Sequence, residues 1–173
     1  YQKRTRNILN IKEDLAKGKK GEEMVLQLFK SVGIELDFNN DKSKFKFWDL
    51  RCEDKASDFS IEVKNDMMSV ATGNIAIEVS NPRSGKDSGI SVTKSDLWIH
   101  IVGREIWCCE SKALKKFVSD TEPFKVVKYA GDGNATIYLY KKDDIMPKIF
   151  TELAKKQPKQ IISYLNQTLS GNW

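Results

Sequence analysis

The residues with the clearest chemical potential are an aspartate and a Glu-x-Lys tripeptide that follows it. Asp49 ends the run Phe-Trp-Asp, and Glu62, Val63 and Lys64 lie in a segment of alternating apolar and polar residues. Side chains alternate between the two faces of a strand, so Glu62 and Lys64 are expected to share a face. Two carboxylates suit Mg²⁺, and a nearby ammonium can position a water or stabilise developing negative charge. Hydrolysis of a phosphodiester bond needs this set of groups.

A β-hairpin is the element expected to bring these residues together. Residues 45–51 and 59–65 are typical of strands, and the polar segment 52–57 between them is typical of a turn. In such a hairpin the chain returns beside itself, so Asp49 arrives next to Glu62. The alternative is that Glu62 and Lys64 form an ordinary exposed ion pair on a surface strand.

A helix is predicted before the hairpin, and it carries a third acid. Apolar residues recur at spacings of three and four from about residue 11 to 32, and Gly33 follows as a stop signal. At ~100° per residue, Glu22 shares the apolar face with Phe29, whereas Glu23 lies on the polar face. Glu22 is therefore the acid expected to point inward.

Glu78 is a fourth candidate. It lies in a predicted strand at residues 74–80, whose isoleucines and valine occupy the opposite face. Glu78 is either an additional metal ligand or a solvated strand residue, and the sequence favours neither.

The rest of the chain predicts an α/β fold with a central mixed β-sheet flanked by helices. At 173 residues the chain has the size of a single domain, 1–173, with a catalytic core at about 11–142 and a helical C-terminal segment at about 143–173. The basic start, 1–10, lacks apolar periodicity and is expected to be an arm. Further strands are predicted at 97–102 and 104–109, a helix from 110 or 111, a hairpin from 125–130 and 136–141, and helix at 144–169 with a break at Pro158.

The order of a helical Glu22, a strand with Asp49 and a strand with Glu62 and Lys64 resembles the PD-(D/E)XK nuclease superfamily. The resemblance covers about residues 18–102. Within that superfamily, the helix start Gly-Lys-Lys-Gly-Glu at 18–22 resembles archaeal Holliday-junction resolvases and phage-type endonucleases. The resemblance to this superfamily implies a restriction-endonuclease-like core. Two departures stand: Trp48 replaces the proline that precedes the aspartate in the family, and a later Gln-x-x-x-Tyr signature of the RecB-like branch is missing.

The resemblance also implies roles for the candidate residues. Asp49 and Glu62 would bind Mg²⁺, with Mn²⁺ as a substitute, together with the main-chain carbonyl of Val63. Lys64 would lie by the attacking water, and Glu22 would complete the site.

Basic residues suggest where a polyanion would bind. The chain has 29 Lys and Arg against 24 Asp and Glu, a formal charge of +5 that suits a polyanionic partner. Arg83 and Lys86, in a predicted mobile loop at 81–89, and Lys94 are candidates for phosphate contacts. Solvated loop charge is the simpler interpretation of each.

The single histidine and the cysteines are expected to be structural. His100 lies in the middle of an apolar strand, where a hydrogen-bonded core histidine is favoured over a catalytic base. Cys108 and Cys109 are neighbours on a strand and point to opposite faces, so we expect them to pack as small apolar groups. Three cysteines without metal or disulfide spacing favour a reducing, intracellular compartment.

These patterns predict a soluble, Mg²⁺-dependent endonuclease that hydrolyses phosphodiester bonds in branched or duplex DNA. No membrane span and no signal peptide is predicted. A homodimer is expected, because cutting two strands requires two neighbouring sites. The alternatives are an RNA-directed nuclease and a non-catalytic nucleic-acid-binding or assembly protein with a vestigial site.

Overall fold

The computed structural model describes residues 2–54 and 57–169, with side chains from residue 16 onward. In this part of the chain the strands form a mixed six-stranded sheet, in the order β1-β2-β3-β5-β6-β9, and a three-stranded sheet, β4-β8-β7. The α/β class with a mixed sheet is confirmed. The helices are α1 (Gln2–Ser31), α2 (Ser69–Thr72), α3 (Ser111–Asp120), α4 (Lys142–Ile149), α5 (Pro158–Leu169) and the 3₁₀ turn η1 (Gly89–Ser91). The strands are β1 (Asp37–Phe38), β2 (Leu50–Asp54), β3 (Ser57–Asn65), β4 (Asn74–Ser80), β5 (Leu97–Val102), β6 (Glu105–Glu110), β7 (Lys125–Ala130), β8 (Ala135–Lys141) and β9 (Thr151–Glu152).

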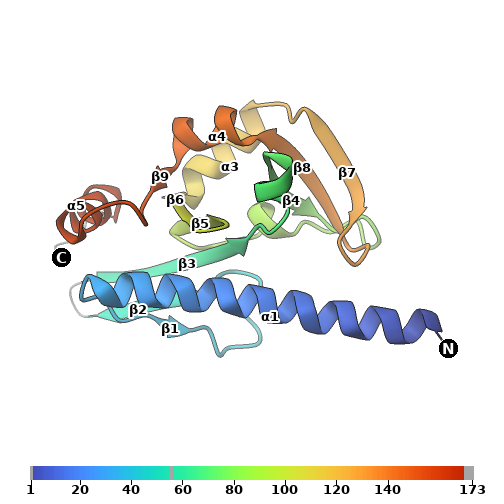
Figure 1. Cartoon of the computed structure of the whole chain (residues 1–173), viewed down its shortest axis with the longest axis horizontal. Helices are drawn as coiled ribbons and strands as arrows, with labels where there is room; N and C mark the ends of the chain where they lie inside the picture. The colour runs from blue at the N-terminus through green and yellow to red at the C-terminus, as the bar shows by residue number, and fades with distance from the viewer. Residues whose placement is uncertain (1, 55–56, 170–173) are drawn as a thin grey trace.

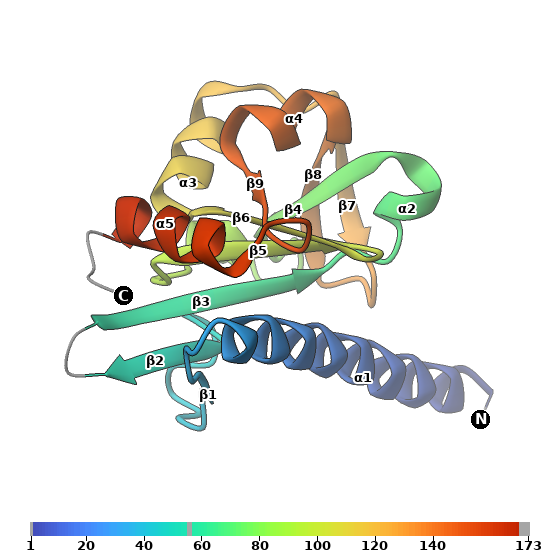
Figure 2. The same cartoon turned by 60° about the vertical axis from the view of Figure 1, so that its left-hand side comes forward.

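Two hydrophobic cores lie on the two faces of the larger sheet. One contains Phe29 of α1 and Leu165 of α5 against β3 and β5. The other packs α3, α4 and the smaller sheet around Trp98 of β5. Figures 1 and 2 show α1 along one side of β3, with α3, α4 and the second sheet on the other. Because both faces are covered, all six residues of β5 are buried.

The adjacent cysteines of β6 show the alternation between these cores. Cys108 belongs to the core under α1 and α5, whereas Cys109 belongs to the core under α3 and α4. Both thiols are free and buried. The prediction that they pack as small apolar groups on opposite faces is confirmed.

Helix α1 is longer than the sequence predicts. The arm expected at residues 1–10 is wrong for residues 2–10, because the helix begins at Gln2; Tyr1 lies outside the described residues. No glycine or proline interrupts this stretch, and lysine, arginine and glutamine favour helix, so the backbone is helical although apolar periodicity is missing. The N-terminal half of α1 accordingly extends beyond the rest of the fold (Figures 1 and 2).

The end of α1 falls where the glycine predicts it. Gly33 has φ +83° and its N–H bonds to the carbonyl of Lys30, while the N–H of Ile34 bonds to the carbonyl of Phe29. This pair of bonds is a Schellman motif, in which glycine accepts the left-handed conformation at little cost. Ile34 and Phe29 are both buried in the same core, which fixes the direction of the exit.

The predicted strand at 45–51 is wrong in its first part. Residues 42–47 form turns, and β2 begins only at Leu50. The Asp41 carboxylate accepts hydrogen bonds from the N–H and hydroxyl of Ser43, and such local bonds compete with a strand. The expected turn at 52–57 is correspondingly too long, since β2 continues to Asp54 and β3 starts at Ser57.

Other elements match more closely. Strand β4 has the predicted bounds but belongs to the second sheet, and the hairpin of β7 and β8 forms as expected. The C-terminal helical segment is wrong in its break: α4 ends at Ile149, a short strand follows, and Pro158 begins α5. Proline suits a first helical position because no intrahelical bond needs its missing N–H. No described helix is both long and apolar enough to cross a membrane.

Candidate active site

Strand β3 extends beyond its hairpin partner, and Asp49 occupies the place where the partner stops. Pairing of β2 with β3 ends at Leu50 opposite Ile61. The N–H of Asp49 then donates to the carbonyl of Ile61 at 2.9 Å, and its Oδ2 accepts from the N–H of Val63 at 2.8 Å. The N–H and C=O of one strand residue point to the same edge, so the Val63 carbonyl also faces this side. The hairpin thus brings Asp49 to the Glu-x-Lys segment, as the sequence predicts.

Glu62 and Lys64 lie on the same face of β3. Their register partners on the parallel strand β5 are Trp98 and His100. Ile61, which precedes Glu62 and pairs with Leu97, is fully buried in the core beneath α1. The two charged side chains therefore point to the face on which the second sheet lies, and neither is fully exposed.

The Glu62 carboxyl has the most perturbed environment of the site. Burial raises its pKa to about 9, and the nearby charges of Asp49, Glu22 and Glu78 act in the same direction, while Lys64 opposes them. Its Oε2 is buried without a hydrogen-bond partner among the described residues. Buried polar atoms are normally paired, so an unpaired carboxylate oxygen among other carboxylates needs an explanation.

Two neighbouring carboxyls are perturbed in the same sense. Burial raises the pKa of Asp49 to about 6, against the opposing effects of the Val63 N–H and the Lys64 charge. The pKa of Glu22 is raised to about 7, mainly by burial and secondly by repulsion from Asp49, while the charge of Lys19 acts in the opposite direction. The inward orientation predicted for Glu22 agrees with its partial burial and its interaction with Asp49.

Close packing of α1 on the end of β3 positions Glu22. A Cβ added to Gly21 would lie 2.9 Å from the Cβ of Asn65. The Asn65 side-chain amide donates to the carbonyl of Lys17 at 2.9 Å, which ties the helix to the strand. Neither contact is predicted from the sequence, although Gly21 directly precedes Glu22 and Asn65 directly follows Lys64.

A buried carboxylate connects the two sheets and so determines where Glu78 lies. Asp66 Oδ2 accepts hydrogen bonds from the N–H of Ala76 on β4 at 3.1 Å and from His100 Nε2 at 2.9 Å. His100 Nδ1 accepts from the Trp98 indole N–H, so the ring proton is on Nε2. The prediction of a hydrogen-bonded core histidine is confirmed. Asp66, which the sequence analysis did not single out, holds β4 near β3, where Glu78 interacts electrostatically with Glu62.

The basic candidates lie in different surroundings. Arg83 donates from Nε to the carbonyl of Gly133 at 2.9 Å and stacks over Tyr129, so it is bound to the hairpin of β7 and β8. The ammonium of Lys94 lies 4.2 Å from the ring centroid of Phe47. Lys86 is exposed.

The donor set fits a hard divalent cation. In residues 16–54 and 57–169, no three side chains of His, Cys, Asp or Glu form a group that could hold a metal ion. The set expected from the sequence has only two such side chains, Asp49 and Glu62, with the Val63 carbonyl as third donor. Mg²⁺ commonly takes one or two carboxylates and keeps waters or substrate oxygens as its other ligands. Such a cation would give the unpaired Glu62 Oε2 a partner. It would also reduce the repulsion among the three carboxyls whose pKa values are raised, Glu22, Asp49 and Glu62.

Fold and site together define an α/β protein with a partly buried acidic cluster, flanked by Lys64 and Lys19, where β3 extends past β2. Comparison with protein-family models, curated proteins and solved structures finds no match to the chain.

Proposed function

We propose that this protein is a Mg²⁺-dependent endonuclease that hydrolyses phosphodiester bonds in DNA. The observation that carries the proposal is the buried, unpaired Oε2 of Glu62 beside Asp49, Glu22 and Lys64. Burying like charges together destabilises a fold, and such clusters concentrate at functional sites. A bound cation and a phosphate substrate would turn this repulsion into attraction.

Each residue of the site would have a distinct role in hydrolysis. Asp49, Glu62 and the carbonyl of Val63 hold Mg²⁺, for which Mn²⁺ substitutes. The metal, when bound, polarises a phosphoryl oxygen and lowers the pKa of a coordinated water. The Lys64 ammonium orients the attacking water and stabilises charge that develops on the phosphate. Glu22, with its pKa raised to about 7, is suited to hold or release a proton near neutral pH.

The arrangement of elements supports a restriction-endonuclease-like core. Helix α1, the residue before β2 and strand β3 supply Glu22, Asp49 and Glu62 in the order expected for such a core, and β3 pairs in parallel with β5. We further propose that the chain acts on branched or duplex DNA as a homodimer, because two neighbouring sites allow both strands to be cut.

A cleavage assay on matched variants tests the proposal. The purified chain is incubated with Mg²⁺ and branched, duplex or single-stranded DNA, and with RNA. We expect the wild type to cut DNA, and Glu62→Gln and Lys64→Ala to lose cleavage by about 100-fold or more. Glu22→Gln should also impair cleavage, whereas Glu23→Gln, at the exposed neighbouring position, should not.

The outcomes separate the alternatives. Cleavage that survives both Glu62→Gln and Lys64→Ala would show that the site is assigned wrongly. Binding without cleavage of any substrate would favour the non-catalytic nucleic-acid-binding protein, and cleavage of RNA alone would favour the RNA-directed nuclease.

A further inference from the structure

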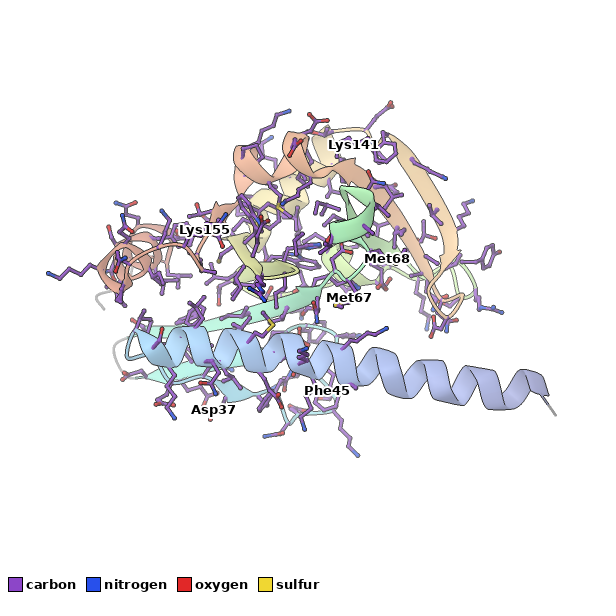
Figure 3. All side chains as sticks on the ribbon, in the orientation of Figure 1. Asp37, Phe45, Met67, Met68, Lys141 and Lys155 are labelled. Atoms are coloured by element: carbon purple, nitrogen blue, oxygen red, sulfur yellow. The ribbon has the colours of Figure 1, made fainter. Side chains whose placement is uncertain are left out.

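A turn rich in lysine and phenylalanine leads directly into the candidate site. Residues 42–47, Lys-Ser-Lys-Phe-Lys-Phe, are here called the lysine–aromatic loop; they form the turns that replace the expected strand. Phe45, labelled in Figure 3, is 49% exposed, and the three lysines of the loop are exposed as well. Asp49 follows Phe47 by two residues, a span of at most about 7 Å.

Hydrogen bonds hold this loop in one shape. The amide of Asn39 donates to the carbonyls of Lys44 and Trp48 at 3.1 and 2.8 Å. From the other side, the Thr93 hydroxyl and the Lys94 N–H donate to the carbonyl of Phe47 at 2.8 and 3.0 Å. An exposed phenylalanine in a braced loop loses little conformational entropy when it binds a ligand, so the loop is preorganised for contact.

Positive charge gathers at the end of the loop nearest the acids. The ammonium groups of Lys46 and Lys94 lie 4.9 and 4.2 Å from the ring centroid of Phe47. Two cations on one ring offer a phosphate a pair of contacts, and phosphate contacts supply most nucleic-acid affinity. Lys44, by contrast, is already paired with Asp41 at 3.2 Å.

We propose that the lysine–aromatic loop binds an unpaired nucleotide next to the bond that is cut, with its base stacked on Phe45 and its phosphate between Lys46 and Lys94. The inference rests on the proposed action on nucleic acid and specifies the substrate: DNA with a single-stranded or splayed segment at the site. Bases stack on exposed aromatic rings with little regard for sequence. Within a duplex each base face is already covered by its neighbours, so a ring such as Phe45 has nothing to stack on.

A second recess beside the loop is less suited to this ligand. It has a volume of about 250 Å³, and its lining contains three acids, Asp37, Asp41 and Glu53, and two cations, Lys44 and Arg51. Both cations are already paired with acids of the recess, and carboxylates repel phosphate at short range. Phe45 and Lys46 do not line the recess, so the nucleotide is bound away from it.

Binding measured without cleavage tests the inference. Fluorescence anisotropy follows a labelled single-stranded oligonucleotide, or a blunt duplex of the same length, as full-length protein is added in EDTA. We expect Phe45→Ala to weaken single-strand binding about tenfold and duplex binding much less. Phe45→Trp should retain single-strand binding. Phe124→Ala is the matched control, because Phe124 is 50% exposed and lies beside Lys141, but directly precedes β7, away from the loop.

Several results would overturn the inference. These are no binding of single strands by the wild type, unchanged binding by Phe45→Ala, equal losses for Phe45→Ala and Phe124→Ala, or equal losses for single strand and duplex. The outcome is separate from that of the cleavage assay. If Glu62→Gln abolishes metal-dependent cleavage but Phe45→Ala leaves binding unchanged, the proposed nuclease activity is supported and the proposed role of the loop is refuted. If Phe45→Ala weakens single-strand binding but no substrate is cleaved, the loop is a binding site in a protein without catalysis.

Discussion

The carboxylate of Asp49 accepts the main-chain N–H of Val63 at 2.8 Å, and so supplies the hydrogen bond that a longer β2 would have made. One contact therefore serves two purposes. It satisfies the backbone of β3 beyond the end of β2, and it holds an acid beside Glu62 through one of its two oxygens. Stability and the proposed chemistry share this residue.

Asparagine and alanine at position 49 should separate these two purposes. Asp49→Asn keeps an oxygen that can accept from Val63, whereas Asp49→Ala leaves that N–H without its partner, at a cost of roughly 1–3 kcal/mol. We expect both variants to lose cleavage, and only Asp49→Ala to lose stability on that scale. Urea denaturation measures the difference, and equal stability of the two variants would contradict this account of the hydrogen bond.

Without divalent cations, the protein should become less stable as the pH rises. The folded pKa of Glu62, about 9, lies above its ordinary value of 4.5, so between these limits the folded state retains a proton that the unfolded state has lost. The stability that this group contributes is then highest below its ordinary pKa and falls toward pH 9, whereas the lowered pKa of Asp66 acts only at more acidic pH. The raised pKa values of Asp49 and Glu22 act in the same direction.

Glu62→Gln should flatten this dependence. We expect the variant to unfold with a free energy roughly 1–3 kcal/mol larger than the wild type at pH 8, because the folded wild type must keep a proton on Glu62 that the unfolded chain has released, whereas glutamine does not titrate. The difference should be much smaller at pH 5. Denaturation at both pH values measures the effect. Glu35→Gln, an exposed substitution, is the control, and a wild type that gains stability from pH 5 to pH 8 would refute the prediction.

Mg²⁺ should stabilise the protein, and more strongly at pH 8 than at pH 6. A ligand that binds only the folded state raises the melting temperature, and a cation at this site must displace protons from the carboxyls. Thermal denaturation with Mg²⁺ or EDTA measures the shift, which Glu62→Gln should abolish. A shift that persists unchanged in this variant would place the bound metal elsewhere.

Two glycines of α1 give a matched test of helix docking. A Cβ at Gly21 would lie 2.9 Å from the Cβ of Asn65, whereas one at Gly18 would have no atom within 4 Å. Gly18→Ala should stabilise the helix by up to about 1 kcal/mol through propensity alone. Gly21→Ala should push α1 from β3, lowering both stability and cleavage by moving Glu22. Equal gains in stability from the two substitutions would show that the close approach does not matter.

Local sequence pattern predicted the elements of the site better than the contacts between them. The alternation around Glu62 and Lys64 and the helical phase of Glu22 are properties of single segments, and the structure agrees with both. The role of Asp66 depends on Ala76 and His100, which come from strands in different sheets. No periodicity records such a contact, because it forms only when the two sheets pack.

The error at residues 45–47 has a similar origin. Alternating lysine and phenylalanine is typical of a strand. This stretch nevertheless forms turns, in which the Asp41 carboxylate accepts from the N–H of Ser43 and the Asn39 amide donates to the carbonyl of Lys44. Strand β3 continues past Ile61 to Asn65, so a partner for a longer β2 is present. The local polar bonds prevail over it, and the alternating pattern does not record that competition.

Labelling of the buried cysteines can be used to measure local unfolding of the sheet. Cys52, Cys108 and Cys109 are at most 3% exposed, and burial raises the pKa of the Cys108 thiol to about 12. Thiol reagents attack the thiolate, so in the folded state these groups are both hidden and in the unreactive form. Because Cys108 and Cys109 face different cores, the rates at which they are labelled report when each side of the sheet is breached. The proposed metal site lies at β3, whereas both cysteines lie on β6, with β5 between the two strands. Comparing the two rates with and without Mg²⁺ would therefore show how far stabilisation by the cation spreads through the sheet.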